Sequence, residues 1–159
     1  MKNNDILRRI RFTFDFGDSK MKELFSLGGL ETDRTAISDW LKSEEDSAHK
    51  TLVDKDLAAF LNGLIVKNRG KREGEDPKPE KSLNNNIILR KIRIALNMKD
   101  QDMLEIFDIA RFQISKHELS AIFRKPGQSQ YRECKDQFLR NFLMGLQIKH
   151  RGQIDEAEG

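Results

Sequence analysis

With 159 residues, 37% of them hydrophobic and 35% charged, the chain can fill the core of one domain or of two small ones. Its polar start lacks the apolar region of a signal peptide, and no apolar run approaches the roughly 20 residues that span a bilayer. The net charge of +3 is modest, and one cysteine, Cys134, excludes an intramolecular disulfide, so we expect a cytoplasmic protein with no membrane partner.

A tandem repeat runs through the chain. Residues 4–70 align without a gap with residues 86–152, and 21 of the 67 positions are identical. The clearest match pairs Asn4-Asp-Ile-Leu-Arg-Arg-Ile-Arg with Asn86-Ile-Ile-Leu-Arg-Lys-Ile-Arg. This agreement predicts two copies of one module: a first repeat over 1–70, a charged linker over 71–85, a second repeat over 86–152 and an acidic tail over 153–159.

Charge is divided unevenly between the two copies. Residues 4–70 contain 11 Lys and Arg against 12 Asp and Glu, a balance of −1. Residues 86–152 contain 13 against 7, a balance of +6. A polyanion is therefore expected to prefer the second repeat.

Apolar residues recur at helical spacing in four segments of each copy, and the predicted class is all-α, with two tandem four-helix repeats. A side chain suited to N-capping stands at the start of each of the first three predicted helices. In chain order these pairs are Asn4 with Asn85 or Asn86, Asp18 with Asp100, and Asp33 with Ser115, and the fourth helix is predicted to start near Asp54 or Asp136.

Glycines mark two further features of the repeat. Gly63 and Gly145 lie inside the fourth predicted helix, where glycine costs about 1 kcal/mol relative to alanine. Their presence in both copies suggests close approach by another backbone, and the first helix of the same or the sister repeat is the candidate. Gly28-Gly29 permits a left-handed C-cap after the second helix, whereas the second copy has Ala110-Arg-Phe there.

The second and third helices of each copy resemble a helix-turn-helix, whose second helix lays its outward face in the major groove of DNA. That face carries a basic residue, a serine and a basic residue at i, i+4 and i+8, which form one line along a helix. Lys and Arg there suit phosphate or guanine contacts, although a solvated helix face has the same pattern. Together with two arginines of the first helix, the candidate nucleic-acid-binding residues are Arg34, Ser38, Lys42, Lys116, Ser120, Arg124, Arg90 and Arg93.

Catalytic motifs are missing from the sequence. It has no Walker loop, dinucleotide fingerprint or nucleophile elbow, and none of its three histidines has the i, i+4 spacing of a helical metal pair. We therefore predict no catalytic residue, metal or cofactor. The expected function is non-enzymatic binding of DNA or RNA, mainly through the second repeat. The alternative is a protein-interaction or scaffold module with a groove between the repeats; the sequence leaves the oligomeric state open.

Four motifs of the repeat together resemble the YehS family of small bacterial proteins. They are Asn-x-Ile-Leu-Arg-x-Ile-Arg, Met-x-x-Leu/Ile-Phe, the Ile/Leu-Ser-x-x-Leu/Phe helix and the closing Phe-Leu-x-Gly-Leu-x-x-Lys. The resemblance covers nearly all of residues 1–152, and its most characteristic stretch is Asp136-Gln-Phe-Leu-Arg-Asn-Phe-Leu-Met-Gly-Leu. It implies a bacterial cytosolic protein with a duplicated domain, and it implies no activity and no functional residues.

Overall fold

The computed structural model describes residues 1–70 and 78–152, and all regular structure in these ranges is helical. Residues 71–77 of the predicted linker and the whole predicted tail, 153–159, lie outside the described residues. No helix in the described ranges is long and apolar enough to cross a membrane. The eight helices found there are α1 (Asn3–Phe14), α2 (Asp18–Leu27), α3 (Arg34–Leu41), α4 (Asp54–Arg69), α5 (Asn85–Ala95), α6 (Asp100–Ile109), α7 (Lys116–Ile122) and α8 (Asp136–Arg151).

Each helix of the second repeat begins 82 residues after its counterpart in the first. The chain is therefore all-α, with two tandem four-helix repeats, as the sequence predicts. Helix α5 begins at Asn85, the last residue assigned to the predicted linker.

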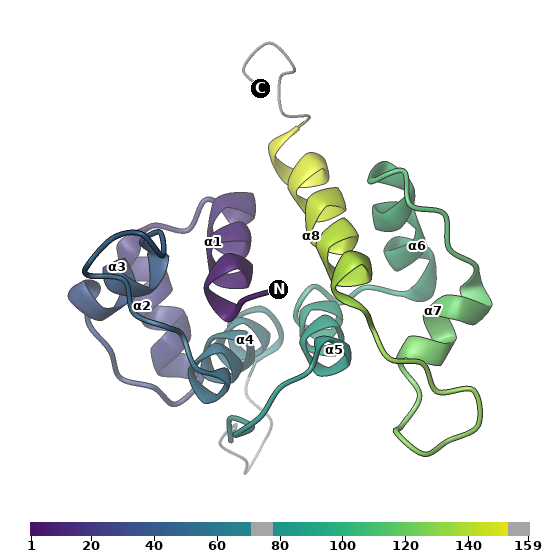
Figure 1. Ribbon diagram of the computed structural model, residues 1–159, viewed down its shortest axis with the longest axis horizontal. Coiled ribbons are helices and arrows are strands. Elements are labelled where there is room, and N and C mark those ends of the chain that lie inside the picture. Colours follow the sequence, from purple (N-terminus) through teal and green to yellow (C-terminus); the bar gives the residue numbers. More distant parts are fainter. Residues whose placement is uncertain (71–77, 153–159) are drawn as a thin grey trace.

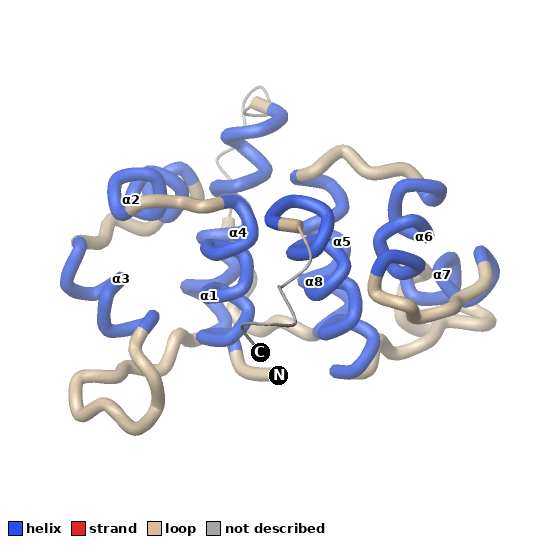
Figure 2. The backbone as a smooth tube through the Cα atoms, turned by 90° about the horizontal axis from the view of Figure 1, so that it is seen from above, coloured by secondary structure: helices blue, strands red, loops and turns tan. Residues whose placement is uncertain are grey.

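The two repeats meet through their first and fourth helices. Helices α1, α4, α5 and α8 lie in the middle of the molecule, while α2 and α3 lie at one end and α6 and α7 at the other (Figures 1 and 2). Across the middle, α1 packs against α8 and α5 packs against α4. Within each repeat, the fourth helix packs against the second: α4 against α2, and α8 against α6.

Aromatic side chains occupy equivalent core positions in both repeats. The rings of Phe25 and Phe60 lie 5.1 Å apart, and those of Phe107 and Phe142 lie 5.4 Å apart. All four side chains are fully buried. Because they sit on the predicted apolar faces of the second and fourth helices, they confirm the helical periodicity read from the sequence.

The repeated asparagine is not the N-cap of the first helix, contrary to the prediction. Asn4 lies one residue inside α1 and is only 3% exposed. Its Nδ2 donates to the carbonyl oxygens of Trp40 at 2.9 Å and Lys50 at 2.8 Å, and its Oδ1 accepts from the backbone N–H of Leu52 at 3.0 Å. Asn86 repeats these three contacts in the second repeat with Ile122, Arg132 and Cys134.

Capping of the other helices agrees with the prediction only in part. Asp33 and Ser115 are N-caps, and their side chains accept from the backbone N–H of Ala36 and Glu118. Asp18 and Asp100 are not caps but the first residues of α2 and α6, whereas α4 and α8 begin at Asp54 and Asp136, where the sequence predicts the start of the fourth helix. In that position a carboxylate still interacts favourably with the helix dipole.

The internal glycines are in close contact with backbone, as predicted, but the neighbour is the second helix of the same repeat. A Cβ on Gly63 would lie 1.7 Å from the carbonyl oxygen of Leu24, and a Cβ on Gly145 would lie 2.2 Å from that of Ile106. The expectation that the first helix makes this approach is therefore wrong. The fourth helix packs on the second along a surface that has no room for a side chain at this position.

The turn after the second helix has the same backbone form in both copies. Gly29 has a φ of 95° in the first repeat, and Arg111, at the equivalent position, has a φ of 58° in the second. Both are left-handed conformations, which glycine adopts without steric cost and other residues adopt less readily. The second repeat thus makes the turn without a glycine.

Candidate nucleic-acid interface

The outward face of α7 carries the predicted residues Lys116 and Ser120, and both are exposed, as is the neighbouring His117. The opposite face of the helix is buried through Leu119 and Ile122. Ser115 and Glu118 form a capping box that fixes the start of the helix. Helix α7 lies at the end of the molecule that is far from α2 and α3 of the first repeat (Figure 1).

The loop after α7 extends the same charged region. Lys125 and Arg132 are exposed, and Arg132 lies 4.0 Å from the carboxylate of Glu118. Arg124 is half-buried, and its guanidinium donates to the carbonyl oxygen of Ser129 at 3.3 Å. Arg124 therefore holds the loop, while Lys125 and Arg132 face solvent.

The two arginines of the first helix have partners within the protein. Arg90 donates to the carbonyl oxygen of Phe123 at 3.3 Å, at the end of α7. Arg93 donates to the Met98 carbonyl at 3.1 Å and pairs with Asp100 at 2.7 Å, and its guanidinium lies 4.7 Å from the centre of the Phe123 ring. Both arginines thus contact Phe123 at the C-terminal end of α7 and hold the helix in place. The exposed face of α7 is formed by other residues.

The same role can be seen in the first repeat, where Arg8 donates to the carbonyl oxygen of Lys42 at 2.9 Å. Carbonyls at a helix C-terminus have no partner inside the helix, and a guanidinium can supply one. The sequence pattern does not predict this structural role, and the one sign of it in the sequence is the identity of Arg8 and Arg90 in the two copies.

Helix α3 carries the equivalent residues in a different electrostatic setting. Arg34 is exposed and pairs with Asp18 at 3.0 Å, and Ser38 is exposed. Lys42 donates to Asp39 at 2.9 Å, and this hydrogen bond raises the pKa of Lys42 and lowers the pKa of Asp39. The cations of α3 are thus neutralised by acidic neighbours.

Matched segments around the third helix differ strongly in charge. Residues 29–53 hold 3 Lys and Arg against 6 Asp and Glu, a balance of −3. The equivalent residues 111–135 hold 6 against 2, a balance of +4. Because α3 and α7 lie at opposite ends of the molecule (Figures 1 and 2), the predicted residues form two separate surfaces, and only the one at α7 is basic.

The aspartate at the start of each fourth helix contacts a residue that precedes the first helix of the other repeat and an asparagine in the first helix of its own repeat. Asp136 accepts from the Met1 ammonium at 2.6 Å and from Asn85 Nδ2 at 2.7 Å, and these two hydrogen bonds lower the pKa of its carboxyl group. At the equivalent place, Asp54 accepts from the Leu83 backbone N–H at 2.9 Å and from Asn3 Nδ2 at 2.7 Å. The contacts between the repeats are therefore reciprocal.

Comparison with known proteins agrees with this duplicated architecture. Residues 3–70 and 85–152 each match the model of a family described as protein of unknown function (DUF1456). The chain belongs to this family. It is also similar to the uncharacterized protein YehS of Escherichia coli (strain K12), with 40% identity over 147 residues, which are 92% of this chain and 94% of the relative. No solved structure matches the chain significantly. The resemblance to a YehS-like family with a duplicated domain is confirmed.

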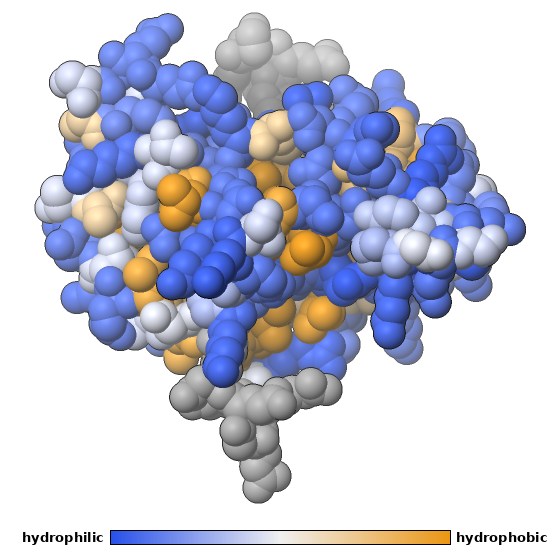
Figure 3. Space-filling model, turned by 60° about the horizontal axis from the view of Figure 1, so that its bottom comes forward, coloured by the Kyte–Doolittle hydropathy of each residue, from blue (hydrophilic) through white to orange (hydrophobic). Residues whose placement is uncertain are grey.

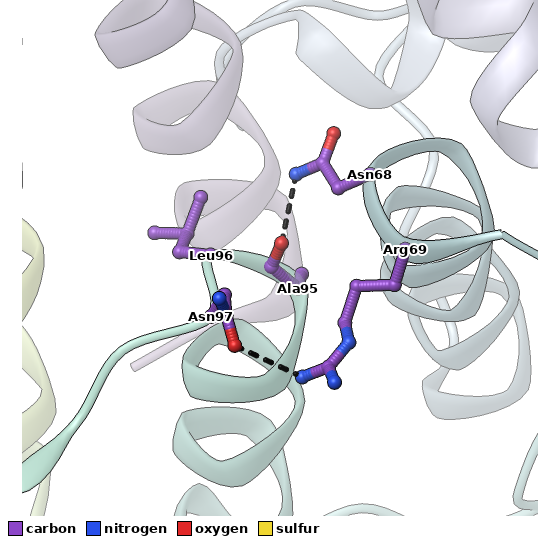
Figure 4. A pocket seen from close by; sticks show the side chains of 5 residues that line it. All are labelled: Asn68, Arg69, Ala95, Leu96 and Asn97. Atoms are coloured by element: carbon purple, nitrogen blue, oxygen red, sulfur yellow. Dashed lines mark hydrogen bonds between the residues drawn. The ribbon is translucent and has the colours of Figure 1, made fainter.

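Among the described residues, hollows lie on two sides of the region where the repeats meet, the place that the scaffold hypothesis assigns to a groove. The first, of 440 Å³, is lined by Asn68, Arg69, Ala95, Leu96 and Asn97. Its polar groups largely pair with one another: Asn68 donates to the Ala95 carbonyl at 2.9 Å, and Arg69 lies 3.4 Å from Asn97 Oδ1 (Figure 4). The polar groups of this hollow are thus engaged in contacts between the C-terminal ends of α4 and α5.

The second hollow, of 330 Å³, lies between α1 and α8 and is lined by Asp5, Arg8, Arg9, Phe12, Met144 and Gln147. The face of the molecule drawn in Figure 3 is mostly hydrophilic, with small groups of apolar atoms over its middle. Within residues 1–70 and 78–152, no group of three His, Cys, Asp or Glu side chains could hold a metal ion.

Proposed function

We propose that this protein is a non-enzymatic nucleic-acid-binding protein that uses the α7 end of its second repeat. The observation that carries the proposal is the group of exposed cations at that end, Lys116, Lys125 and Arg132, in a segment with a balance of +4. At the equivalent positions of the first repeat stand Arg34, Ser43 and Lys50, in a segment with a balance of −3.

Exposed lysines and arginines bind the phosphate backbone and release its condensed counterions, which makes the affinity depend steeply on salt. His117 and Ser120 lie on the same exposed face of α7 as Lys116 and can donate hydrogen bonds to phosphate oxygens or base edges. Arg124 supports the adjoining loop through its hydrogen bond to Ser129. The α7 end therefore combines positive charge with hydrogen-bond donors on a fixed backbone.

The charge difference between the two ends favours contact through one repeat. A symmetric helix-turn-helix dimer reads two half-sites with equivalent helices. Here the α3 end carries the acidic residues Glu44, Glu45 and Asp46, which repel phosphate. We therefore expect binding without a preference for palindromic sequences.

Charge reversal at matched positions tests the proposal. The variant Lys116→Glu/Arg132→Glu changes the α7 end, and its control Arg34→Glu/Lys50→Glu makes the same change in charge at the equivalent positions of the α3 end. Fluorescence anisotropy with a labelled duplex and a labelled single strand, in about 50 mM salt, measures the affinity. We expect at least a roughly tenfold loss for the α7 variant and little change for the control.

Equal losses in the two variants would contradict an interface at α7, because they would reflect overall charge alone. The absence of any binding to DNA or RNA at low salt would end the proposal altogether. A salt titration adds a second check, since each lost phosphate contact is expected to reduce the slope of log K against log salt by about 0.9 for a duplex.

A further inference from the structure

Arg9 in α1 and Lys91 in α5 occupy equivalent positions, and each reaches toward the fourth helix of the other repeat. Lys91 has both a hydrogen-bond acceptor and an ion-pair partner there. Its ammonium donates to Asn62 Oδ1 at 2.6 Å and pairs with Glu80 Oε2 at 2.9 Å, and its side chain is only 12% exposed. Glu80 comes from the segment before α5, so a carboxylate on non-helical chain fills the place beside this cation.

Arg9 has no such acceptor among the described residues. It is half-buried, and its one polar contact there is from Nη1 to the sulfur of Met144 at 3.7 Å, a weak acceptor. Asp5, on the same helix, forms an ion pair with Arg8 instead. Burial and the nearby positive charge of Arg140 lower the pKa of Arg9, against a smaller opposing effect of Asp5.

The hollow of 330 Å³ between α1 and α8 opens beside Arg9, and Phe12 and Met144 supply its apolar lining. A cation that has lost part of its hydration gains most from a carboxylate, which a guanidinium can bind with two parallel hydrogen bonds. We propose that this hollow binds the carboxylate of a glutamate in an extended polypeptide segment, which Arg9 holds as Lys91 holds Glu80.

The lining favours a carboxylate on a peptide over a phosphate. Asp5 lies in the hollow, and its charge repels a doubly charged phosphate more strongly than a singly charged carboxylate. Phe12 and Met144 can cover the methylene groups of a glutamate side chain. The site is separate from the α7 end and does not depend on nucleic-acid binding there.

The segment that fills the equivalent place provides the probe. A blocked peptide with the sequence of residues 78–84, Lys-Pro-Glu-Lys-Ser-Leu-Asn, is titrated into the full chain while the Arg9 Nε–Hε signal is followed by NMR. A saturable shift of Arg9 is expected. The same peptide carrying Glu80→Gln keeps the shape and loses the charge, and we expect it to bind about three- to tenfold more weakly.

Two variants separate the site from general charge effects. Arg9→Gln is expected to abolish the Glu-dependent part of the binding, while Arg132→Gln, which removes the same charge at the α7 end, leaves it unchanged. Arg9 is half-buried, whereas Ile10 belongs to the buried core, and circular dichroism and the melting temperature of Arg9→Gln check that the fold is retained.

The titration is repeated with a chain that ends at Gly152, because residues 153–159 contain Asp155, Glu156 and Glu158. Tighter peptide binding by this shorter chain would identify the protein's own acidic residues as competitors and would support the site. The absence of an Arg9-dependent shift in both chains would overturn the proposal. So would an Arg9→Gln variant that loses affinity for nucleic acid and keeps affinity for the peptide.

Discussion

A buried asparagine in each repeat, Asn4 and Asn86, joins the first helix to the chain that follows the third. Both amide hydrogens and the carbonyl oxygen of each side chain are hydrogen-bonded to backbone. No other side chain of this length supplies two donors and an acceptor in this geometry, and aspartate lacks the donors. An unsatisfied buried partner costs about 1–3 kcal/mol, which explains why both copies have asparagine.

Cys134 is a second residue whose chemistry depends on burial. It is 2% exposed and fills the place that Leu52 fills in the first repeat. Burial, together with the charges of Asp136 and Glu133, raises the pKa of its thiol to about 12. Since the thiolate is the reactive form, we expect the folded protein to react with thiol reagents at about pH 8 only as fast as it unfolds, whereas the unfolded chain in guanidinium reacts at once.

The raised pKa also predicts how stability depends on pH. The unfolded thiol ionises near the ordinary value of 9.0, and the folded thiol stays protonated to about 12. The contribution of Cys134 to the free energy of unfolding is therefore fully present below pH 9.0 and is lost as the pH rises toward 12. Urea titrations of the wild type and Cys134→Ala over this range measure it; a parallel decline in both proteins would contradict this assignment.

At the scale of the helical elements, the tight packing of the fourth helix on the second is the strongest constraint. Gly63 and Gly145 bring α4 and α8 into backbone contact with α2 and α6. The contact offsets the cost of glycine inside a helix because it allows the large aromatic side chains, Phe25 with Phe60 and Phe107 with Phe142, to meet beside it.

Alanine at these glycines is expected to be severely destabilising. The new methyl group of Gly63→Ala would lie 1.7 Å from the Leu24 carbonyl oxygen, so the backbones must separate, and we expect a loss of about 3 kcal/mol in the free energy of unfolding. Gly17→Ala is the control, because a Cβ there meets nothing within 4 Å and φ is −79°. Urea denaturation should change by less than about 1 kcal/mol for the control.

The whole molecule is held together by reciprocal contacts between the repeats. Helix α1 packs against α8, α5 packs against α4, and the ends of these helices exchange hydrogen bonds through Asp54 and Asp136. At the other end, Arg69 donates to the Ile94 carbonyl, and Arg151 lies over the Phe12 ring at 4.6 Å. Since each repeat covers apolar surface of the other, neither is expected to unfold by itself.

A mutation in one repeat should therefore destabilise the other equally. Trp40 is the one tryptophan of the chain and reports on the first repeat, whereas Asn86 belongs to the second. We expect Asn86→Ala to lower the urea midpoint measured by Trp40 fluorescence as much as the midpoint measured by circular dichroism. Ser120→Ala, on the exposed face of α7, is the control and should leave both midpoints unchanged. An unshifted Trp40 transition would mean that the repeats unfold independently.

Sequence reasoning located the repeat, all eight described helices and most of the core because these depend on local spacing. An apolar stripe at 3.6-residue intervals and a cap such as Asp33 act within one or two turns of the chain. The exposed Lys116 and Ser120 face of α7 followed from the same spacing, since residues opposite a buried stripe are exposed. The charge difference between the copies also follows from the sequence, by counting the Lys, Arg, Asp and Glu residues of each copy.

The tertiary structure decided every feature that depends on which segments meet. Asn4 links α1 to the chain after α3 because that chain returns beside α1. Gly63 contacts α2 because that helix, rather than α1, packs over it. Arg90 and Arg93 have partners near α7, whereas Arg9 has no partner comparable to Glu80 within residues 1–70 and 78–152. Residue type and spacing determine which interactions a side chain can form. The long-range packing of the helices determines which partner it forms them with.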